Sequence, residues 1–474
     1  MAGNVKVGLF GIGLDTYWPQ FEGLKDKLVG YQQKIHEKIA SRDVEVVDAG
    51  LVDSLDKAYA ASDLFKQEDV NIIFLFISTY ALSSTVLPVV QEVKVPVVVL
   101  NMQPVSRIDY DSFNQLESRE AMTGEWLAHC QACSAPEIAS VFNRAGIEYH
   151  LVSGYMQDET AWQEIFAWVD AAAVVEGLRR SAVGVMGHYY LGMLDVYSDM
   201  TQLAAVFGNH FEIVEIDEVK LLRDQVTEND LKAMIGQFEE TFDVSEECPP
   251  HEIERAARTS SALHKMVEQH NLSALAYYYE GTPGSDHEDI VTSVIAGNTL
   301  LTANHVPVAG EYEIKNVLAM KIMDLLGTGG SFSEFYAMDF DDDVILLGHD
   351  GPAHAAIAEG RVKLVPLQVY HGKPGKGLSI QMSVQHGPVT ILSVLQDGEG
   401  NVKLLVAEGA AEEGPTLHIG NTNSRYRFSI GAKAFMNAWS SAGPSHHCAI
   451  GVGHVAEKIE KLGQILGIEV IRVC

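Results

Sequence analysis

The sequence predicts an α/β protein with two doubly wound parallel-sheet domains, followed by an antiparallel β-rich C-terminal domain. Three observations support this. Nearly continuous apolar runs alternate with helical patterns up to about residue 180, and a second alternation of this kind begins near residue 181. After residue 344 the runs are short and Gly-rich turns separate them. Continuous apolar strands between helices are typical of parallel sheets with both faces covered, and closely spaced short strands are typical of antiparallel ones.

The first domain is expected over residues 1–180. Its predicted strands are Val5–Phe10, Asn71–Ile77 and Val95–Leu100, and Tyr149–Tyr155 is a further candidate. Because ligands bind such sheets at the carboxyl ends of the strands, the residues that follow three of these strands are candidate binding residues. They are Gly11–Trp18, Ser78–Tyr80 and Asn101–Gln103.

Gly11 and Gly13 follow the first strand, as in a dinucleotide-binding loop. The third glycine of that fingerprint is missing, since position 16 is Thr16. We therefore do not expect a nicotinamide cofactor.

The second domain is expected over residues 181–325, and the third over residues 326–474. Predicted strands of the second are Val183–His188, Phe211–Ile216 and Leu272–Tyr279. The third domain contains short β runs and is expected to be a sandwich or a barrel-like sheet. These runs are Val362–Val369, Leu378–Val384, Val389–Leu395 and Val402–Glu408.

The composition excludes several classes of protein. The 474-residue chain has 33 basic and 64 acidic residues, a formal net charge of −31, so neither nucleic acid nor an anionic membrane is an expected partner. The sequence has neither a signal-peptide layout nor an apolar run of the roughly 18–20 residues that cross a bilayer, and a cytoplasmic location is expected. Five scattered cysteines indicate reduced thiols, and we interpret the Cys130-Gln-Ala-Cys133 motif as structural.

The candidate site lies in the C-terminal half. Glu311 follows Gly310, Glu334 follows a Gly-rich stretch at residues 327–333, and His349 follows Leu-Leu-Gly; each is expected where a regular element meets a Gly-rich turn. A His446-His447 pair comes near the end of the chain. Two carboxylates with imidazoles form a ligand set that suits Mn, Co or Fe and, less well, Mg.

Each of these residues also has an ordinary explanation. A glutamate at a helix start commonly interacts with the helix dipole, and Glu334 could be solvated. A lone histidine such as His349 is more often hydrogen-bonded in a turn than a ligand. The combination, surrounded by glycines that permit close approach, is what indicates a site.

The arrangement resembles the L-arabinose isomerase family and its L-fucose-isomerase-like relatives. That pattern has a Gly-Glu with a Lys four residues on, a Ser-Phe-x-Glu, a Leu-Gly-x-His-like turn and a late His-His. This chain has Gly310-Glu311 with Lys315, Ser331-Phe-Ser-Glu334, Leu346-Leu-Gly-His349 and His446-His447. Weaker likeness extends upstream to Ala128-His129 and Gly154-Tyr-Met-Gln-Asp158.

The resemblance implies a metal-dependent aldose–ketose isomerase acting through a cis-enediol, on L-arabinose or a related aldose such as D-galactose. Mn²⁺, or Co²⁺ or Mg²⁺, would be held by Glu311, Glu334, His349 and His447, with Glu311 and Glu334 as the acid–base pair. A homohexamer or homotetramer is implied. In the family the N-terminal domain of a neighbouring subunit lines the site, and His129 would be one of its residues.

The predicted sugar-recognition residues depart from the family. Its N-terminal Gly-Ser-Gln-x-Leu-Tyr-Gly loop is replaced by a loop that contains Asp15 and Trp18, and its His-Thr-Phe element becomes Ser78-Thr79-Tyr80. Because hydroxyl-matched pockets discriminate strongly between sugars, the preferred sugar can differ from L-arabinose. We expect substrate contacts from Asp15, Trp18, Tyr80, His129, His188 and His446.

Two other functions are compatible with the sequence. The chain could be a sugar-binding or regulatory protein on an isomerase scaffold, although binding alone does not require two acids at a metal. It could also catalyse a metal-assisted epimerisation. Metal-free sugar binding would favour the first alternative, and product analysis separates the second.

Overall fold

The computed structural model describes residues 5–42, 44–368 and 375–474. The chain divides between Glu176 and Gly177 into two compact units. We call them the N-terminal unit and the C-terminal unit. The predicted domain boundaries at 180/181 and 325/326 follow the ends of helices α7 (Glu159–Arg179) and α14 (Ile314–Leu325); the three-domain division itself stays a prediction.

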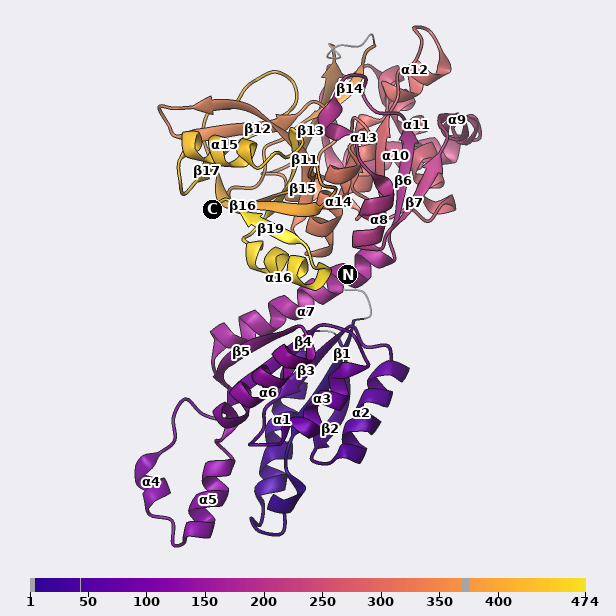
Figure 1. Ribbon diagram of the computed structural model, residues 1–474. Coiled ribbons are helices and arrows are strands. Elements are labelled where there is room, and N and C mark those ends of the chain that lie inside the picture. The colour runs from indigo at the N-terminus through magenta and orange to yellow at the C-terminus, as the bar shows by residue number, and fades with distance from the viewer. Residues whose placement is uncertain (1–4, 43, 369–374) are drawn as a thin grey trace. The chain divides into compact units, whose positions relative to one another are not determined.

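The N-terminal unit is built on one five-stranded parallel sheet (Figure 1). The doubly wound order is β2-β1-β3-β4-β5. Its strands are β1 (Lys6–Ile12), β2 (Glu45–Val52), β3 (Ile72–Phe76), β4 (Val97–Gln103) and β5 (Tyr149–Tyr155). Its other helices are η1 (Asp15–Tyr17), α1 (Leu24–Ala40), α2 (Leu55–Gln67), α3 (Ser83–Gln91), α4 (Tyr110–Asn114), α5 (Arg119–Leu127) and α6 (Gln131–Ala145). Every residue of β3 is buried, as a strand in the middle of a covered sheet requires.

The C-terminal unit begins with a second parallel sheet, in the order β10-β9-β6-β7. The strands are β6 (Ala182–Gly187), β7 (His210–Val214), β9 (Ala274–Tyr278) and the unpredicted β10 (Val308–Ala309). The helices are η2 (Leu194–Val196), α8 (Met200–Phe207), α9 (Ile216–Asp224), α10 (Glu228–Thr241), α11 (Pro250–Gln269), α12 (Asp286–Val291), α13 (Ile295–Ala303) and α14.

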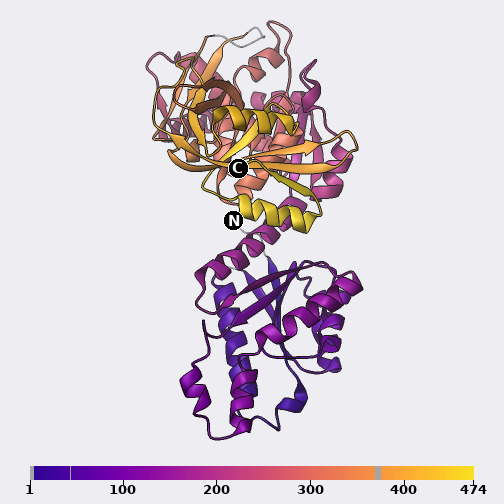
Figure 2. The ribbon, with the colours of Figure 1, turned by 60° about the vertical axis from the view of Figure 1, so that its left-hand side comes forward.

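The rest of the C-terminal unit is a closed antiparallel barrel. Strands β15-β18-β11-β12-β17-β16 pair in that order, and β16 pairs back with β15; β19 adds to β16 in parallel. The strands are β11 (Gly329–Asp339), β12 (Val344–His349), β15 (Gly387–Gln396), β16 (Val402–Glu412), β17 (Thr422–Phe428), β18 (His447–Val452) and β19 (Glu469–Arg472). Helices α15 (Ala432–Ser441) and α16 (Ala456–Leu466) lie outside it (Figure 2). A small sheet contains β8 (Phe242–Val244), β13 (Val362–Leu367) and β14 (Gly377–Gln381), and η3 covers Ala355–Ile357.

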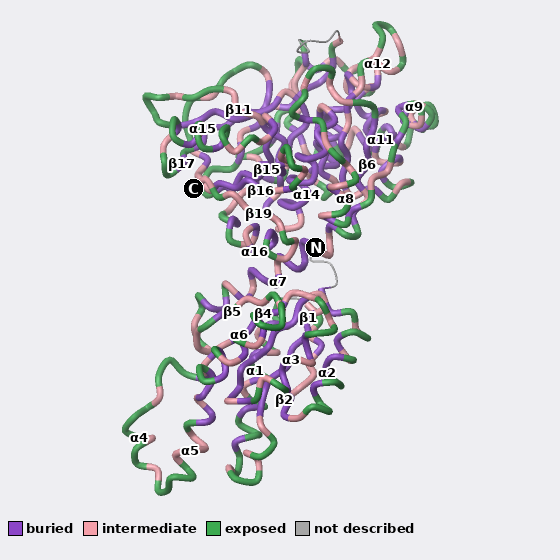
Figure 3. The backbone as a smooth tube through the Cα atoms, in the orientation of Figure 1, coloured by how far each residue is buried: buried purple, intermediate pink, exposed green. Residues whose placement is uncertain are grey.

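Helix α14 connects the second parallel sheet to the barrel. All its residues from Ile314 to Asp324 are buried, because it packs against β9 and β10 on one side and β11, β15 and β18 on the other (Figure 3). A helix buried all round cannot shift without disturbing both sheets. The turn that precedes it is therefore held between them.

The predicted fold class is confirmed, and of the two C-terminal architectures the barrel is present. One local prediction is wrong. The Gly-rich stretch before Glu334 is the start of the 11-residue strand β11, so Glu334 lies inside a ladder and not at a turn. Glycine reads as a turn signal in sequence, whereas here Gly329 and Gly330, with φ angles of 97° and 112°, form an irregularity in the ladder with β18. Val369, the last residue of one predicted strand, lies outside the described residues.

The cysteine prediction is wrong for one pair. Cys130 stands at the start of α6 and Cys133 one turn later, and a disulfide joins them. One helical turn brings the two sulfur atoms together, which spacing alone left undecided. The free cysteines are Cys248, Cys448 and Cys474. Among the described residues, no helix is both long and apolar enough to cross a membrane.

Candidate active site

The turn between β10 and α14 carries Glu311 in a strained conformation. Glu311 and Tyr312 have φ angles of 57° and 59°, in the left-handed region that non-glycine residues seldom adopt. The Tyr312 amide donates to the carbonyl of Tyr277 at 3.0 Å, and the Glu313 amide to that of Gly310 at 3.0 Å. Two consecutive residues in this region cost about 1–3 kcal/mol each, and such strain persists mainly at functional sites.

The barrel supplies Glu334 and His447. Glu334 on β11 is opposite His447 on β18 and opposite Gly348 on β12. Directly opposed residues of antiparallel strands point to the same face, so the carboxylate and the imidazole share one face of the barrel. His349 follows Gly348 at the end of β12.

The close approach of β17 requires a glycine at position 348. A Cβ atom at this position would lie 1.9 Å from the carbonyl oxygen of Thr422 on β17. Only glycine allows the two backbones to approach this closely, and the end of β12 that carries His349 depends on it.

An aromatic ring holds the two histidines in place. The Phe332 ring centroid lies 4.5 Å from that of His349 and 4.3 Å from that of His447. The two imidazole centroids are 5.5 Å apart. Packing of this kind limits the rotation of both imidazoles.

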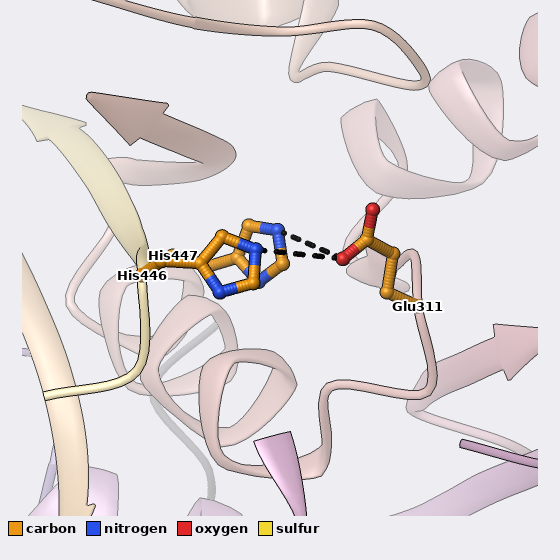
Figure 4. Close-up of side chains that lie close together, drawn as sticks. All are labelled: Glu311, His446 and His447. Carbon is orange, nitrogen blue, oxygen red and sulfur yellow. Dashed lines mark ion pairs between the residues drawn. The ribbon is translucent and has the colours of Figure 1, made fainter. Parts of the chain in front are cut away.

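Glu311 faces the His446-His447 pair (Figure 4). Its Oε2 atom lies 3.5 Å from His446 Nε2 and 3.4 Å from His447 Nε2. One ligand atom from each of these three residues lies within 4.8 Å of the others. Glu311 and the His446-His447 pair, which lie far apart in the sequence, thus meet at one point.

The charges of these groups differ sharply. Burial lowers the pKa of His447 to about 3, so its imidazole is neutral at pH 7. Burial also acts to lower the pKa of His446, but its contacts with Glu311 and Asp195 outweigh this and raise the pKa to about 9. Burial acts to raise the pKa of Glu311, yet the neighbouring histidines hold it below its usual value. The site therefore contains an ionised carboxylate beside a neutral and a protonated imidazole.

Glu313 is a site residue that the sequence analysis missed. Its side chain is fully buried, 3.5 Å from His447 Nδ1 and 3.4 Å from the Ser445 hydroxyl. Burial raises its pKa to about 8. In many metal sites a carboxyl group behind the second nitrogen of an imidazole orients the ring; here Glu313 Oε2 and His447 Nδ1 face each other without a hydrogen bond. The only sequence signal was its position in Gly310–Lys315, and a second acid two residues from Glu311 is not informative by itself.

The donor atoms fit a divalent cation. Within the described part of the chain, Glu311 Oε2 and His447 Nε2 are buried and make no hydrogen bond, although they face each other. Buried polar atoms nearly always have a partner, and a cation between these two atoms would supply one. Neutral imidazole and carboxylate are the ligands that Mn²⁺, Co²⁺ and related ions accept.

A cavity of about 420 Å³ opens beside these groups. Glu311, Glu334 and His349 line it together. Aromatic residues make up much of the remaining wall, namely Tyr190, Tyr277, Tyr278 and Tyr279. Its size suits a small molecule, and the combination of aromatic walls with convergent polar groups is typical of ligand sites.

The other predicted substrate residues fall in two places. His188 is exposed after β6, with its ring 5.5 Å from that of Tyr278, a residue of the cavity wall. Asp15, Trp18, Tyr80 and His129 lie in the N-terminal unit. Trp18 Nε1 donates to Asp53 at 2.9 Å, and His129 Nδ1 lies 2.9 Å from the carbonyl of Glu125. These substrate assignments stay predictions.

The comparisons with known proteins agree with this architecture. Residues 329–469 match the L-arabinose isomerase C-terminal domain family. The L-arabinose isomerase of Klebsiella pneumoniae subsp. pneumoniae is 23% identical over 317 residues, 63% of this chain and 62% of that protein. That of Bacillus subtilis is 21% identical over 350 residues, 71% and 69% of the two chains. L-arabinose isomerase 1 of Bacillus licheniformis is 21% identical over 424 residues, 86% and 81%.

Two parallel sheets followed by an antiparallel barrel define the class of the protein, an α/β protein whose barrel segment is similar to the L-arabinose isomerase C-terminal domain. The similarity of the chain to the L-arabinose isomerases is low and extends over 63–86% of its length. The identity of 21–23% leaves most side chains outside the shared motifs different.

Proposed function

We propose that this protein is a metal-dependent aldose–ketose isomerase that acts on a free aldose. The observation that carries the proposal is the meeting of Glu311 with the His446-His447 pair beside a cavity that Glu334 and His349 also line. The named activity of the relatives supports the same reaction class.

The reaction moves a carbonyl group from C1 to C2. A proton leaves C2, the O1 atom gains a proton and the O2 atom loses one, and a proton is delivered to C1. The intermediate is a cis-enediol. Two carboxyl groups at one cavity can serve as base and acid in these transfers. We assign these roles to Glu311 and Glu334, without specifying which is the base.

The metal would be held by Glu311, Glu334, His349 and His447. When bound, it supplies Lewis-acid stabilisation of the negative charge that develops on the sugar oxygens. Neutral His447, with Glu313 behind it, keeps a lone pair available for that role. Protonated His446 sits beside Glu311 and can hydrogen-bond a substrate oxygen. We propose Mn²⁺, with Co²⁺ or Mg²⁺ as substitutes.

The proposal includes an oligomer. Asp15, Trp18, Tyr80 and His129 would contact the sugar from a neighbouring subunit of a homohexamer or homotetramer, whereas His188 and His446 would act within the same subunit. L-arabinose and related aldoses such as D-galactose are the proposed substrates, in the cytoplasm. The division into residues 1–180, 181–325 and 326–474 belongs to this proposal as well.

The test is a ketose-formation assay on chelator-treated protein, over a panel of pentoses, hexoses and 6-deoxyhexoses, with and without added Mn²⁺. We expect turnover only when metal is present. Chromatography of the products separates ketoses from epimerised aldoses. Isothermal titration with Mn²⁺ measures metal binding independently.

Three outcomes would contradict the proposal. Turnover that a chelator leaves unchanged would exclude the metal role. An aldose product would indicate epimerisation. Stoichiometric Mn²⁺ binding without turnover of any sugar would point to a binding or regulatory protein.

A further inference from the structure

Asp195 makes a short polar contact with the candidate site from outside its sequence motifs. Its Oδ2 atom accepts from the backbone amide of His446 at 3.0 Å and lies 2.6 Å from Nδ1 of the same residue. One oxygen thus contacts both the main chain and the ring of His446. The other ring nitrogen lies 3.5 Å from Glu311 Oε2, so the imidazole of His446 lies between the carboxylates of Asp195 and Glu311.

Asp195 is itself anchored. The carbonyl of Asp195 accepts from the Nζ atom of Lys315 at 2.5 Å, and Lys315 is buried in α14. Lys315 belongs to the same Gly310–Lys315 stretch as Glu311. Lys315, near the start of α14, therefore fixes the backbone of Asp195. The turn before the same helix carries Glu311, the carboxylate that His446 Nε2 faces.

Packing alone does not explain this placement. Asp195 belongs to the short helix η2, and its neighbours Leu191 and Leu194 are 86% and 73% exposed. Val196 is the only buried residue of η2. The Asp195 side chain is itself 40% exposed, so no apolar contact holds it against His446. Charge-assisted hydrogen bonds are short and directional, and here they account for the position of the carboxylate.

We propose that Asp195 is a positioning residue, which fixes the rotation of the His446 ring so that Nε2 faces Glu311 and the reacting sugar. This inference rests on the proposed function for its catalytic consequence, and on the contacts above for its geometry. Without the carboxylate, the ring keeps its packing against His447, with centroids 3.9 Å apart, but loses the hydrogen bond that directs Nε2 toward Glu311. Outer partners of this kind typically change activity by about 10–100-fold.

The experiment compares Asp195→Ala, Asp195→Asn and Asp195→Glu with the wild type. We expect Asp195→Ala to lower kcat about 100-fold and Asp195→Asn about 10-fold, since asparagine keeps an acceptor oxygen without the charge. KM and the Mn²⁺ dissociation constant should change less than about threefold, because Asp195 is not among the proposed ligands. Asp195→Glu should recover part of kcat.

A double-mutant cycle tests whether Asp195 acts through His446. If Asp195 acts through His446, then Asp195→Ala should add nothing to the effect of His446→Gln. Asp224→Asn is the matched control, because it removes one exposed carboxylate of the same unit, with the side chain 67% exposed. It should leave kcat unchanged. An unchanged kcat in Asp195→Ala, or fully additive effects in the cycle, would overturn the inference.

A second readout does not need turnover. Proton NMR of the protein with ¹⁵N-labelled histidine should show a downfield Hδ1 resonance from His446, lost in both Asp195→Ala and His446→Gln. If the wild type isomerises no sugar but this resonance behaves as expected, the positioning role stands and the proposed function falls. If the resonance is absent from the wild type, the positioning role falls whatever the activity.

Discussion

The predicted functional residues of the C-terminal unit and of the N-terminal unit differ in the contacts they make. In the C-terminal unit, Glu311 and His447 come from distant segments, face each other at 3.4 Å and leave buried atoms without hydrogen bonds. In the N-terminal unit, Trp18 and His129 already have partners within their own unit, and Asp15 is exposed. The first arrangement brings buried donor atoms together without hydrogen bonds, and the second pairs its polar side chains within one unit.

The difference shows which predicted sites consist of residues from a single folded unit. Glu311, His446 and His447 converge because β18 and the turn before α14 are fixed by packing within one unit, whereas the addition of Glu334 and His349 to this group stays a prediction. The predicted substrate residues that follow strands of the first sheet, such as Trp18 and Tyr80, lie in the N-terminal unit. Their proposed sugar contacts require the surface of a neighbouring subunit. The predictions that follow test this contrast, from the largest expected effect to the smallest.

The largest effect is expected from Glu311→Gln. Removing an acid–base carboxylate that also binds the metal should lower kcat by at least about 10³-fold, because such a group contributes roughly 10²–10⁴-fold by proton transfer alone. Glu334→Gln should behave alike. The assay is ketose formation with saturating Mn²⁺. Glu359→Gln, whose side chain is 46% exposed, is the control. Full activity of either site variant would remove the proposed acid–base pair.

Gly348→Ala should destabilise the C-terminal unit by about 3 kcal/mol, since the added methyl group would overlap the Thr422 carbonyl and strand backbones yield little. The measurement is the midpoint of urea unfolding. Gly398→Ala is the matched control, because a Cβ atom there meets no atom within 4 Å. Equal stability of both variants would show that β12 can shift, contrary to the rigid site described above.

The lowered pKa of His354, a buried histidine outside the candidate site, should make the stability of the C-terminal unit depend on pH. Burial lowers the pKa of His354 to about 4 from its usual 6.5, so its stabilising effect is complete above pH 6.5 and is lost as the pH falls toward 4. Between pH 7 and 5 the wild type should lose about 2 kcal/mol more unfolding free energy than His354→Gln. His251→Gln, with a 77% exposed side chain, should retain the wild-type slope. Parallel slopes for the wild type and His354→Gln would contradict the expected effect.

The smallest effect is expected in the N-terminal unit. If Trp18 contacts the sugar only in the oligomer, Trp18→Ala should raise KM about tenfold, or about 1.4 kcal/mol, with kcat changed less than threefold. Tyr59→Ala, an exposed aromatic residue of α2, should change neither. The variant should be compared at several protein concentrations by light scattering. A KM equal to that of the wild type would place the recognition residues elsewhere.

The sequence by itself determined the alternation of strands and helices, the two parallel sheets and the antiparallel β-rich domain after them, because apolar periodicity and turn residues act locally; that this domain closes into a barrel was decided by the tertiary structure. It also determined the order and spacing of Glu311, Glu334, His349 and His447, since these are features of the chain. It misjudged the stretch before Glu334, where glycines read as a turn but pairing with β18 makes these residues part of β11.

Only the tertiary structure decided the partners of those residues. Glu313 behind His447 and Asp195 against His446 have no pattern in the sequence; Asp195 is 251 residues from its partner. Helix α14 buries every residue from Ile314 to Asp324 between two sheets, which fixes the turn that carries Glu311. Burial, hydrogen-bond geometry and shifted pKa values arise from contacts between distant segments, and local sequence does not encode which distant segments meet.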